Sequence, residues 1–336
     1  MRILVTATLD DWGIETLSRY GQVSYEGFGE KKRLLAGRKL VRALQGFDVF
    51  VTEVDQMRAK VLAQVDRLQV IACCRAEPVN IDVAMATESG IPVLHAPGRN
   101  AQAVADLTLA LMLMTLRHIP QAMELLRREG GPQGMVKMAV AFFELKGNEL
   151  WGKTVGIIGL GAVGREVARR LRGFGTELIA YDPYVAPDVV EQCGARSVDL
   201  GTLLREADVV SLHAALTEET KGMLGQREFA LMKPTAYFVN TARAELTDEE
   251  ALYEALKDGG IGGAALDVFA EEPPPPDHPL LQLPNVIATP HIGGNTYEIP
   301  VHQSHIVVSD LERLFQGQRP VHIANPETLR TFCWHG

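Results

Sequence analysis

The sequence predicts an α/β protein made of two doubly wound parallel-sheet domains. Three observations support this prediction. The chain has 336 residues, more than one hydrophobic core usually spans, its short apolar runs alternate with helical patterns, and the alternation stops and then resumes near residue 153. With 46% hydrophobic and 22% charged residues, the composition is that of an ordinary globular protein. We therefore expect each half of the pattern to form its own sheet.

The first domain begins with apolar runs that have the length of buried strands. Five of them lie within residues 1–97: RILVTA, QVSYEG, DVFVTE, LQVIACC and IPVLHAP. Helical patterns such as LVRALQG and AKVLAQV stand between them. Strands that alternate with helices form parallel sheets, because each helix returns the chain to the edge where the next strand starts. This part of the chain therefore predicts a parallel sheet.

The middle of the chain contains a connection and a segment without a clear pattern. Residues 102–118 have a helical pattern, which we interpret as the bridge to the second domain. Residues 127–150 are rich in Gly and Arg and match neither a strand nor a helix. We interpret this segment as an excursion or an arm.

The second domain begins where the alternation resumes. Its strand candidates are continuously apolar, as strands covered on both faces are, and they read TVGIIG, TELIAYD, ADVVSLH, TAYFVN, GGAALDV and NVIATP. The EPPPPDHP stretch at 272–279 must be a loop, because proline neither donates to a sheet nor continues a helix. A helical pattern over about 297–316 returns the chain to the first domain. We thus predict one domain from residues 1–101 and 298–336 and another from residues 102–297.

The charge and the apolar pattern exclude two classes of partner. The formal net charge is −9, which repels the phosphate backbone of nucleic acids and the surface of acidic membranes. The longest apolar stretch, Leu107 to Leu116, is far shorter than the ~20 residues that cross a bilayer. Asp10 comes too early for the apolar core of a signal peptide. We expect neither a nucleic-acid partner nor a membrane partner.

The cysteine pattern indicates a reducing compartment. The four cysteines are Cys73, Cys74, Cys193 and Cys333. They show no CxxC spacing, and cysteines that are neighbours in sequence rarely form a disulfide with each other. We therefore expect reduced thiols and a cytoplasmic protein.

A glycine-rich turn follows the first strand candidate of the second domain. Gly159, Gly161 and Gly164 form a GxGxxG motif between TVGII and a helical pattern. The first glycine of such a motif allows a tight turn, the second lets the backbone approach a pyrophosphate, and the third allows close packing of helix on strand. Ala162 and Val163 open the helix, whose N-terminus would hold the anion. The alternative is that the glycines only form a turn.

Asp182 supplies the second half of this pattern. It ends the next strand candidate, 18 residues after Gly164, where a carboxylate can accept hydrogen bonds from the ribose hydroxyls of adenosine. The alternative, that Asp182 only caps the turn at Pro183, does not explain the joint spacing. Together the two features predict a Rossmann domain that binds NAD. NAD is favoured over NADP because the carboxylate would repel a 2′-phosphate.

Three polar residues stand at the ends of strand candidates or just after them. Arg243 follows YFVNTA, Glu272 follows ALDVFAE and His291 follows NVIATP. Ligands of open α/β sheets bind at this edge. Taken singly, each residue has an ordinary interpretation: a solvated arginine, a surface glutamate, and a histidine that is hydrogen-bonded to backbone.

Taken together, these residues have complementary chemistry. Oxidation of a secondary alcohol by NAD requires removal of the hydroxyl proton, and histidine is the side chain suited to that step near neutrality. A carboxylate such as Glu272 would hold the His291 ring in one tautomer and stabilise its protonated form. The guanidinium of Arg243 could bind a substrate carboxylate through paired donors.

Three longer motifs surround these positions. They are VNTAR at 239–243, LDVFAEEP at 266–273 and ATPHIGG at 288–294. These motifs resemble the signatures of the D-isomer-specific 2-hydroxyacid dehydrogenases, in particular the members similar to D-3-phosphoglycerate dehydrogenase. The resemblance extends from about Arg75 to Pro320, and several ordered motifs in one chain are more specific than any single one.

The resemblance implies an NAD-dependent enzyme that moves a hydride between NAD and C2 of a D-2-hydroxy acid or 2-keto acid. It implies that Arg243 binds the substrate carboxylate and that Glu272 and His291 carry out acid/base chemistry. It also implies a flavodoxin-like split substrate domain made from both termini, a central cofactor domain, and a homodimer built through the cofactor domains. Further cofactor contacts are expected from His213, Thr220, Thr241, Ala242, Asp267 and Gly293.

The chain departs from the family in the loop expected to hold the substrate carboxylate. Relatives resemble RAGVGxDNID there, whereas this chain has RAEPVNID at 75–82, which is two residues shorter. Pro78 has no N–H to donate. We assign the substrate contacts to Arg75, Pro78, Val79 and Asn80. Because Glu77 would oppose a phosphate, we expect an uncharged, hydroxyl-bearing substrate tail; the alternative is that Arg75 contacts a phosphate.

Other functions share parts of this pattern. The C-terminal-binding corepressors resemble the family and retain the same arginine, glutamate and histidine, but they carry long disordered extensions. Formate and phosphite dehydrogenases share the cofactor fold, but formate enzymes carry glutamine where this chain has Glu272. A narrower alternative is D-3-phosphoglycerate dehydrogenase itself. His302 and His305 have the spacing of a metal-binding pair, but no further ligand stands at suitable spacing, so we expect no metal.

Overall fold

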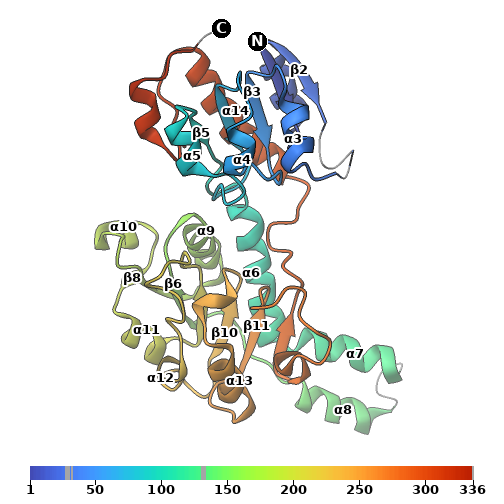
Figure 1. Cartoon of the computed structure of the whole chain (residues 1–336). Helices are drawn as coiled ribbons and strands as arrows, with labels where there is room; N and C mark the ends of the chain where they lie inside the picture. Colours follow the sequence, from blue (N-terminus) through green and yellow to red (C-terminus); the bar gives the residue numbers. More distant parts are fainter. Residues whose placement is uncertain (27–30, 32, 130–133, 335–336) are drawn as a thin grey trace. The chain divides into compact units, whose positions relative to one another are not determined.

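The chain forms two compact α/β units. The computed structural model describes residues 1–26, 31, 33–129 and 134–334. The first unit consists of Met1–Arg99 and Thr296–Gly336, and the second consists of Asn100–Asn295. Each unit contains one parallel sheet with helices packed on it (Figure 1). The predicted fold class, two doubly wound parallel sheets, is confirmed.

The first unit has a sheet of five strands in the order β2-β1-β3-β4-β5, which is the flavodoxin-like order. Its strands are β1 (Arg2–Val5), β2 (Gln22–Tyr25), β3 (Val49–Thr52), β4 (Val70–Cys73) and β5 (Val93–Leu94). Its helices are α1 (Asp11–Ser18), α3 (Gly37–Leu44), α4 (Ala59–Leu62), α5 (Val83–Glu88), α14 (Ile299–Phe315) and the 3₁₀ turn η4 (Pro326–Arg330). All five strands were predicted from the apolar runs.

Both faces of this sheet are buried, as the apolar runs require. On one face Val307 and Leu311 of α14 pack with Val5 of β1 in one cluster of buried residues. On the other face Leu40 of α3 packs with Phe50 of β3 in a second cluster. The helix α14 follows the second unit in sequence, so the first unit is built from both ends of the chain.

The second unit has a sheet of seven strands in the order β12-β11-β10-β9-β6-β7-β8. If β6 is counted as the first strand of this unit and the sheet is read from β8, its first six strands have the order 3-2-1-4-5-6 of the Rossmann fold. Its strands are β6 (Thr154–Ile158), β7 (Glu177–Tyr181), β8 (Arg196–Ser197), β9 (Val209–Leu212), β10 (Tyr237–Asn240), β11 (Gly263–Leu266) and β12 (Val286–Ala288). Its α-helices are α6 (Ala101–Leu116), α7 (Ile119–Glu129), α8 (Met135–Glu144), α9 (Ala162–Leu171), α10 (Pro187–Gln192), α11 (Leu200–Glu206), α12 (Gln226–Phe229) and α13 (Glu249–Lys257), with 3₁₀ turns η1 (Arg172–Phe174), η2 (Ala244–Leu246) and η3 (Pro279–Gln282).

Alternate residues of each strand serve the two faces of this sheet. In β7, Leu178 and Ala180 pack with the side chains of α6 and α9, whereas Ile179 packs with Leu203 of α11 on the other face. Covering on both faces explains why the strand candidates are apolar throughout. All strands pair in parallel, so their carboxyl ends, and the loops that follow them, meet at one edge.

Two segments of the second unit differ from the sequence prediction. The edge strand β8 was not predicted, because its two residues are exposed and carry no apolar run. The segment 127–150, interpreted as an excursion or an arm without an assigned element, contains the end of α7 and all of α8. Eight of the ten residues of the α8 sequence MVKMAVAFFE are apolar, so its apolar arc is too wide to read as the single stripe that marks an amphipathic helix. Residues 130–133 of this segment lie outside the described residues.

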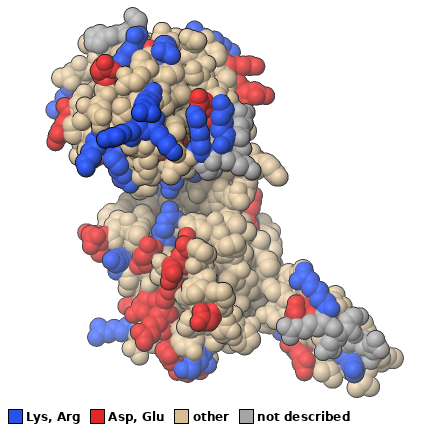
Figure 2. All heavy atoms as spheres, turned by 45° about the vertical axis from the view of Figure 1, so that its right-hand side comes forward, with Lys and Arg blue, Asp and Glu red and all other residues tan. Residues whose placement is uncertain are grey.

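Charge and hydropathy are distributed unevenly. Figure 2 shows acidic side chains gathered on the second unit and basic side chains gathered on the first, on the face that it presents. Among the described residues, no single helix is long and apolar enough to cross a membrane, although the bent pair Ala101–Leu116 and Ile119–Arg127, at 67°, meets the criterion by length and composition. The first of these helices has nine buried residues, as a core helix does.

Candidate active site

The glycine-rich turn lies between β6 and α9 and contains open space. Gly159 has φ +90°, and a Cβ there would lie 2.5 Å from the backbone nitrogen of Ala214. A Cβ on Gly164 would lie 2.1 Å from the carbonyl oxygen of Gly159. A Cβ on Gly161 would meet no described atom within 4 Å, and its φ of −71° suits any residue. Packing therefore requires the first and third glycines, while the second leaves room before the helix N-terminus, as a bound pyrophosphate would need.

Asp182 is joined to this turn. One of its carboxylate oxygens accepts the N–H of Leu160 at 2.7 Å, and the other accepts the N–H of Tyr184 at 2.9 Å. Of the other residues assigned to the turn, Ala162 is exposed and Val163 packs partly against the core. The carboxylate is thus held at the carboxyl end of β7, beside the open glycine, and retains lone pairs for ribose hydroxyls.

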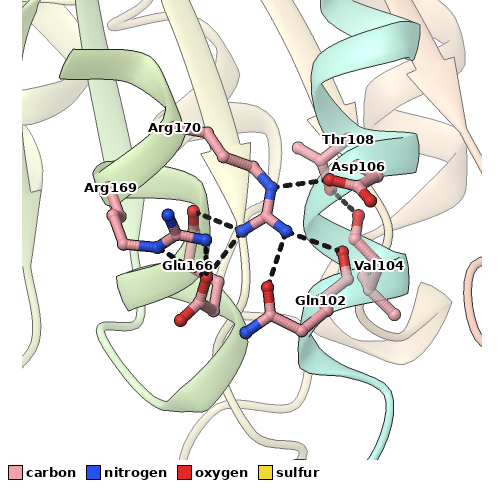
Figure 3. Close-up of polar contacts among 7 residues, drawn as sticks. All are labelled: Gln102, Val104, Asp106, Thr108, Glu166, Arg169 and Arg170. Atoms are coloured by element: carbon pink, nitrogen blue, oxygen red, sulfur yellow. Dashed lines mark hydrogen bonds and ion pairs between the residues drawn. The ribbon is translucent and has the colours of Figure 1, made fainter. Parts of the chain in front are cut away.

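The helix behind the turn is anchored by an arginine (Figure 3). Arg170 of α9 donates to the Asp106 carboxylate at 2.6 Å and to the Gln102 side chain at 2.7 Å, both on α6. It also donates to the Glu166 carboxylate, one turn earlier on α9, at 2.6 Å. Since only 16% of the Arg170 side chain is exposed, these bonds fix α9 against α6. The N-terminus of α9 therefore has a defined position.

Two of the expected cofactor residues lie in the loop after β9. One ring nitrogen of His213 shares a hydrogen bond of 2.8 Å with the Ser211 hydroxyl, while the other, Nδ1, is buried and has no partner among the described residues. Burial lowers the pKa of His213 to about 3, so the ring is neutral. The Thr220 hydroxyl donates to the carbonyl of Ala215 at 2.6 Å and thus holds its own turn. The unpaired Nδ1 and the open space at Gly161 both fit a bound dinucleotide.

The loop after β10 carries Arg243. The Arg243 side chain is exposed and donates from Nη1 to the carbonyl of Ala242 at 2.7 Å, which leaves its other N–H groups available. Thr241 is buried and shares a hydrogen bond of 2.8 Å with the Thr108 hydroxyl. The loop is held by Asn240, whose side chain accepts from the N–H of Ala242 and donates to the carbonyl of Arg243, each at 3.0 Å.

Asp267 organises the loop after β12. It is 1% exposed, and its carboxylate accepts the Thr289 hydroxyl at 2.6 Å, the N–H of Ile292 at 2.9 Å and the N–H of Gly293 at 2.8 Å. These three donors lie on either side of His291. A Cβ on Gly293 would lie 2.9 Å from this carboxylate, so the close approach favours glycine. The buried carboxylate therefore defines the backbone that presents His291.

Glu272 and His291 are in direct contact. His291 donates from Nδ1 to the Glu272 carboxylate at 2.7 Å, and the N–H of Phe269 donates to its other oxygen at 3.2 Å. Burial favours the neutral form of Glu272, but these two hydrogen bonds and the charges of His291 and Arg243 outweigh it and lower the pKa of Glu272. The carboxylate is thus ionised, and the contact leaves Nε2 of the ring free for a substrate. His291 and Glu272 are 44% and 38% exposed.

The three predicted acid/base and anion-binding residues therefore lie at one edge. Arg243, Glu272 and His291 follow β10, β11 and β12, which are neighbours in the sheet. Two supporting residues were missed by sequence reasoning: Asn240, and Glu249 of α13, which accepts the N–H of Ala270 at 3.0 Å. Asn240 stands inside the VNTAR motif directly after a buried strand, and this position could have identified it.

The four residues assigned to substrate lie in the first unit, apart in sequence from the others. Asn80 is buried; its side chain donates to the carbonyl of Asp55 at 2.9 Å and accepts from the Cys73 thiol at 3.3 Å. Val79 is 63% exposed, Pro78 is buried and Arg75 is half-buried. In the described part of the chain, the N–H groups of Ala76 and Glu77 meet no acceptor. The loop thus offers two backbone donors next to Pro78.

The described residues contain no group of three or more His, Cys, Asp or Glu side chains that could hold a metal ion. His305 instead stacks on Trp12, with ring centroids 4.3 Å apart.

Comparison with known proteins gives consistent results. Residues 109–293 match the family model described as D-isomer specific 2-hydroxyacid dehydrogenase, NAD binding domain. A glyoxylate reductase from Thermococcus litoralis is 36% identical, with 98% of each chain covered. A D-3-phosphoglycerate dehydrogenase from Methanocaldococcus jannaschii is 40% identical over 97% of this chain, but the chain spans 59% of that relative. The crystal structure of the TT0316 protein from Thermus thermophilus superimposes with a TM-score of 0.79 at 35% identity, covering 96% of this chain and 100% of that one.

Proposed function

This chain belongs to the D-isomer-specific 2-hydroxyacid dehydrogenase family, and from that premise we propose which of its residues carry the reaction. The protein is an NAD-dependent oxidoreductase that transfers a hydride between NAD and C2 of a D-2-hydroxy acid or its 2-keto acid. Residues 102–297 are proposed as the cofactor domain, and residues 1–101 and 298–336 as the substrate domain. The contact between His291 and Glu272 is the observation that carries the assignment of roles.

NAD supplies the acceptor for the hydride that leaves C2 in the oxidation. As the hydride leaves, Nε2 of His291 takes the hydroxyl proton, and the ionised Glu272 stabilises the imidazolium that results. In the reduction the same protonated ring gives its proton to the carbonyl oxygen. Arg243 binds the carboxylate of the substrate through the guanidinium N–H groups that Ala242 does not use.

The cofactor half of the site is proposed to hold NAD through backbone and carboxylate groups. The pyrophosphate would use the open space at Gly161, before the N-terminus of α9, and the ribose hydroxyls would use Asp182. Asp267 acts through the loop that it holds, because all described hydrogen bonds of its carboxylate go to residues within two positions of His291. Asp267 is therefore a positioning residue.

The substrate is proposed to be a small 2-keto acid without a phosphate. The match covers 98% of the relative named glyoxylate reductase, whereas this chain spans 59% of the relative named D-3-phosphoglycerate dehydrogenase. The exposed Glu77 lies in the loop whose backbone donors would meet the substrate, and its charge would oppose a phosphate.

A panel of 2-keto acids tests both the enzymatic function and the absence of a phosphate on the substrate. Purified protein would be assayed with NADH and glyoxylate, hydroxypyruvate, pyruvate and 3-phosphohydroxypyruvate, and the kcat/KM values compared. We expect turnover of 2-keto acids and the lowest kcat/KM for the phosphorylated one. Tight NAD binding without turnover of any acid would contradict the enzymatic assignment, and a preference for 3-phosphohydroxypyruvate would contradict the tail assignment.

We also propose a homodimer formed through α7 and α8. None of the ten residues of α8 is buried, although eight of them are apolar. The exposed apolar side chains of the two helices include Met123, Leu126, Met135, Val136, Met138, Phe142 and Phe143, the last two 76% and 72% exposed. Monomers rarely expose so large an apolar patch, and a second copy would cover it by an isologous contact.

The oligomeric state tests this surface. Light scattering coupled to size exclusion should give a dimer for the parent and a monomer when Phe142 and Phe143 are both replaced by aspartate. A monomeric parent would contradict the proposal.

The four free cysteines, of which Cys73 and Cys74 are buried, support a reducing compartment, and we propose the cytoplasm.

A further inference from the structure

An exposed tyrosine and an exposed glutamate meet across the strand that carries the glycine-rich turn. The Tyr184 hydroxyl donates to Oε2 of Glu219 at 2.5 Å. Tyr184 lies in the loop after β7, and Glu219 lies in the loop after β9. In the sheet, β7 and β9 are the two neighbours of β6, so the contact joins the loops on both sides of β6. We call it the Tyr184–Glu219 bridge.

Tyr184 has a fixed backbone beside the ribose site. Its N–H donates at 2.9 Å to the carboxylate of Asp182, whose other oxygen accepts from Leu160 of the glycine-rich turn. Its side chain is nonetheless 77% exposed. An aromatic ring held in water beside a nucleotide site offers the apolar face on which a base can stack.

Glu219 also has a fixed backbone. The Thr217 N–H donates to the Thr220 hydroxyl at 2.8 Å, and the Thr220 N–H donates to the Thr217 hydroxyl at 3.2 Å. The Thr220 hydroxyl donates in turn to the carbonyl of Ala215. These reciprocal bonds lock the turn on which Glu219 stands. The bridge therefore connects two ordered loops through two exposed side chains.

We propose that Tyr184 binds the adenine ring of the cofactor by stacking, and that Glu219 positions it by holding the phenol. This inference rests on the proposed NAD site, because it takes the ribose to lie at Asp182. An adenine attached to that ribose would extend beyond the carboxyl end of β7, toward the loops that the bridge joins. The hydrogen bond from Tyr184 to Glu219 also raises the pKa of Tyr184, so the phenol stays a neutral donor.

The roles of the two residues lead to different expected effects. Tyr184→Ala removes the ring, and loss of one base–aromatic stack corresponds to roughly 5- to 100-fold weaker binding. Tyr184→Phe keeps the ring but removes the hydrogen bond, as Glu219→Ala does, and each should weaken binding by about 3-fold. The two changes together should weaken binding no further, because they remove the same contact. Glu219→Gln should rescue most of the loss, since the amide oxygen accepts the same hydrogen bond.

The experiment is calorimetric titration of the full-length protein with ADP-ribose and with nicotinamide mononucleotide, which lacks the adenosine. The ADP-ribose affinity should fall most in Tyr184→Ala, less in Tyr184→Phe and Glu219→Ala, and least in Glu219→Gln. The affinity for the mononucleotide should stay at the parent value in all four variants. KM for NAD should rise while kcat stays unchanged. Glu218→Ala is the matched control, because Glu218 is the exposed glutamate next to Glu219 on the same turn.

Two outcomes would overturn the inference alone. They are an unchanged ADP-ribose affinity in Tyr184→Ala, and an equal loss for both ligands, which would indicate a structural role. A parent protein that binds neither NAD nor ADP-ribose would instead overturn the proposed function, and this inference with it. The parent titration therefore distinguishes the two failures.

Discussion

Gly161 and Gly164 stand three residues apart, but the structure predicts opposite consequences for alanine at the two positions. At Gly161 a Cβ meets nothing within 4 Å, so the fold tolerates it. Gly161 is the N-cap of α9, where alanine is disfavoured by about 0.5–1 kcal/mol, while loss of glycine's freedom in the unfolded chain returns about 0.4–1 kcal/mol. The two terms nearly cancel. The free energy of unfolding of Gly161→Ala should therefore lie within about 1 kcal/mol of the parent value.

At Gly164 the added Cβ would lie 2.1 Å from the carbonyl oxygen of Gly159, which is backbone and cannot rotate away. Helix and turn must separate, and overpacking of this kind typically destabilises by about 1–3 kcal/mol or more. Gly161→Ala leaves stability nearly unchanged but should weaken cofactor binding, because the added Cβ occupies the open space where we propose that the pyrophosphate binds. Gly161→Ala should bind NAD at least ten-fold more weakly, about 1.4 kcal/mol.

The assay pairs urea denaturation with calorimetric titration of NAD for the parent and both variants. Only Gly164→Ala should lose substantial stability, and Gly161→Ala should lose affinity without losing stability. If Gly161→Ala bound NAD like the parent, or unfolded as readily as Gly164→Ala, the space before α9 would not be the phosphate site and the reasoning would be refuted.

Five further results are expected. Asp182→Ser should narrow the preference for NAD over NADP, measured as the ratio of kcat/KM values, and a parent with no preference would contradict the assignment. As the pH rises, Glu272→Gln should lose keto-acid reduction at a lower pH than the parent does, because the amide no longer stabilises protonated His291. His291→Ala should lose about 10²–10⁴-fold in kcat. Parent-like turnover by His291→Ala would exclude the proton-transfer role. Arg243→Ala should reduce kcat/KM for every 2-keto acid by roughly 10²-fold, since a charged hydrogen bond to the substrate is worth about 1.5–3 kcal/mol, and unimpaired turnover would exclude the carboxylate contact. Burial favours the neutral form of Asp208, but hydrogen bonds from Lys233 and a backbone N–H outweigh it and lower the pKa of Asp208. Ionised Asp208 should therefore stabilise the fold at pH 7 and lose that contribution as the pH falls from 3.8 through the lowered pKa. Asp208→Asn should unfold at a lower urea concentration than the parent at pH 7, and the difference should disappear once the pH lies below that pKa.

Local sequence was sufficient wherever one physical signal dominated. Buried strands such as β6 and β10 are continuous apolar runs, because helices cover both faces of their sheets, and all such runs were identified. The glycine spacing with Asp182 likewise pointed to the turn that we propose binds NAD, since phosphate contact requires backbone without side chains. Where that signal is missing, as in the exposed strand β8 or the largely apolar α8, no element was predicted.

The sequence by itself determined the fold class, the cofactor and the family, because the signal for each is a short motif or run of residues that lie close together in the chain. Only the tertiary structure decided how the site is supported. The three donors that surround the Asp267 carboxylate come from positions 289–293, and the partner of Tyr184 lies 35 residues away. Such pairs meet because parallel strands deliver their carboxyl ends to one edge of a sheet, whatever their order in the chain, and no local pattern records which loops then face each other.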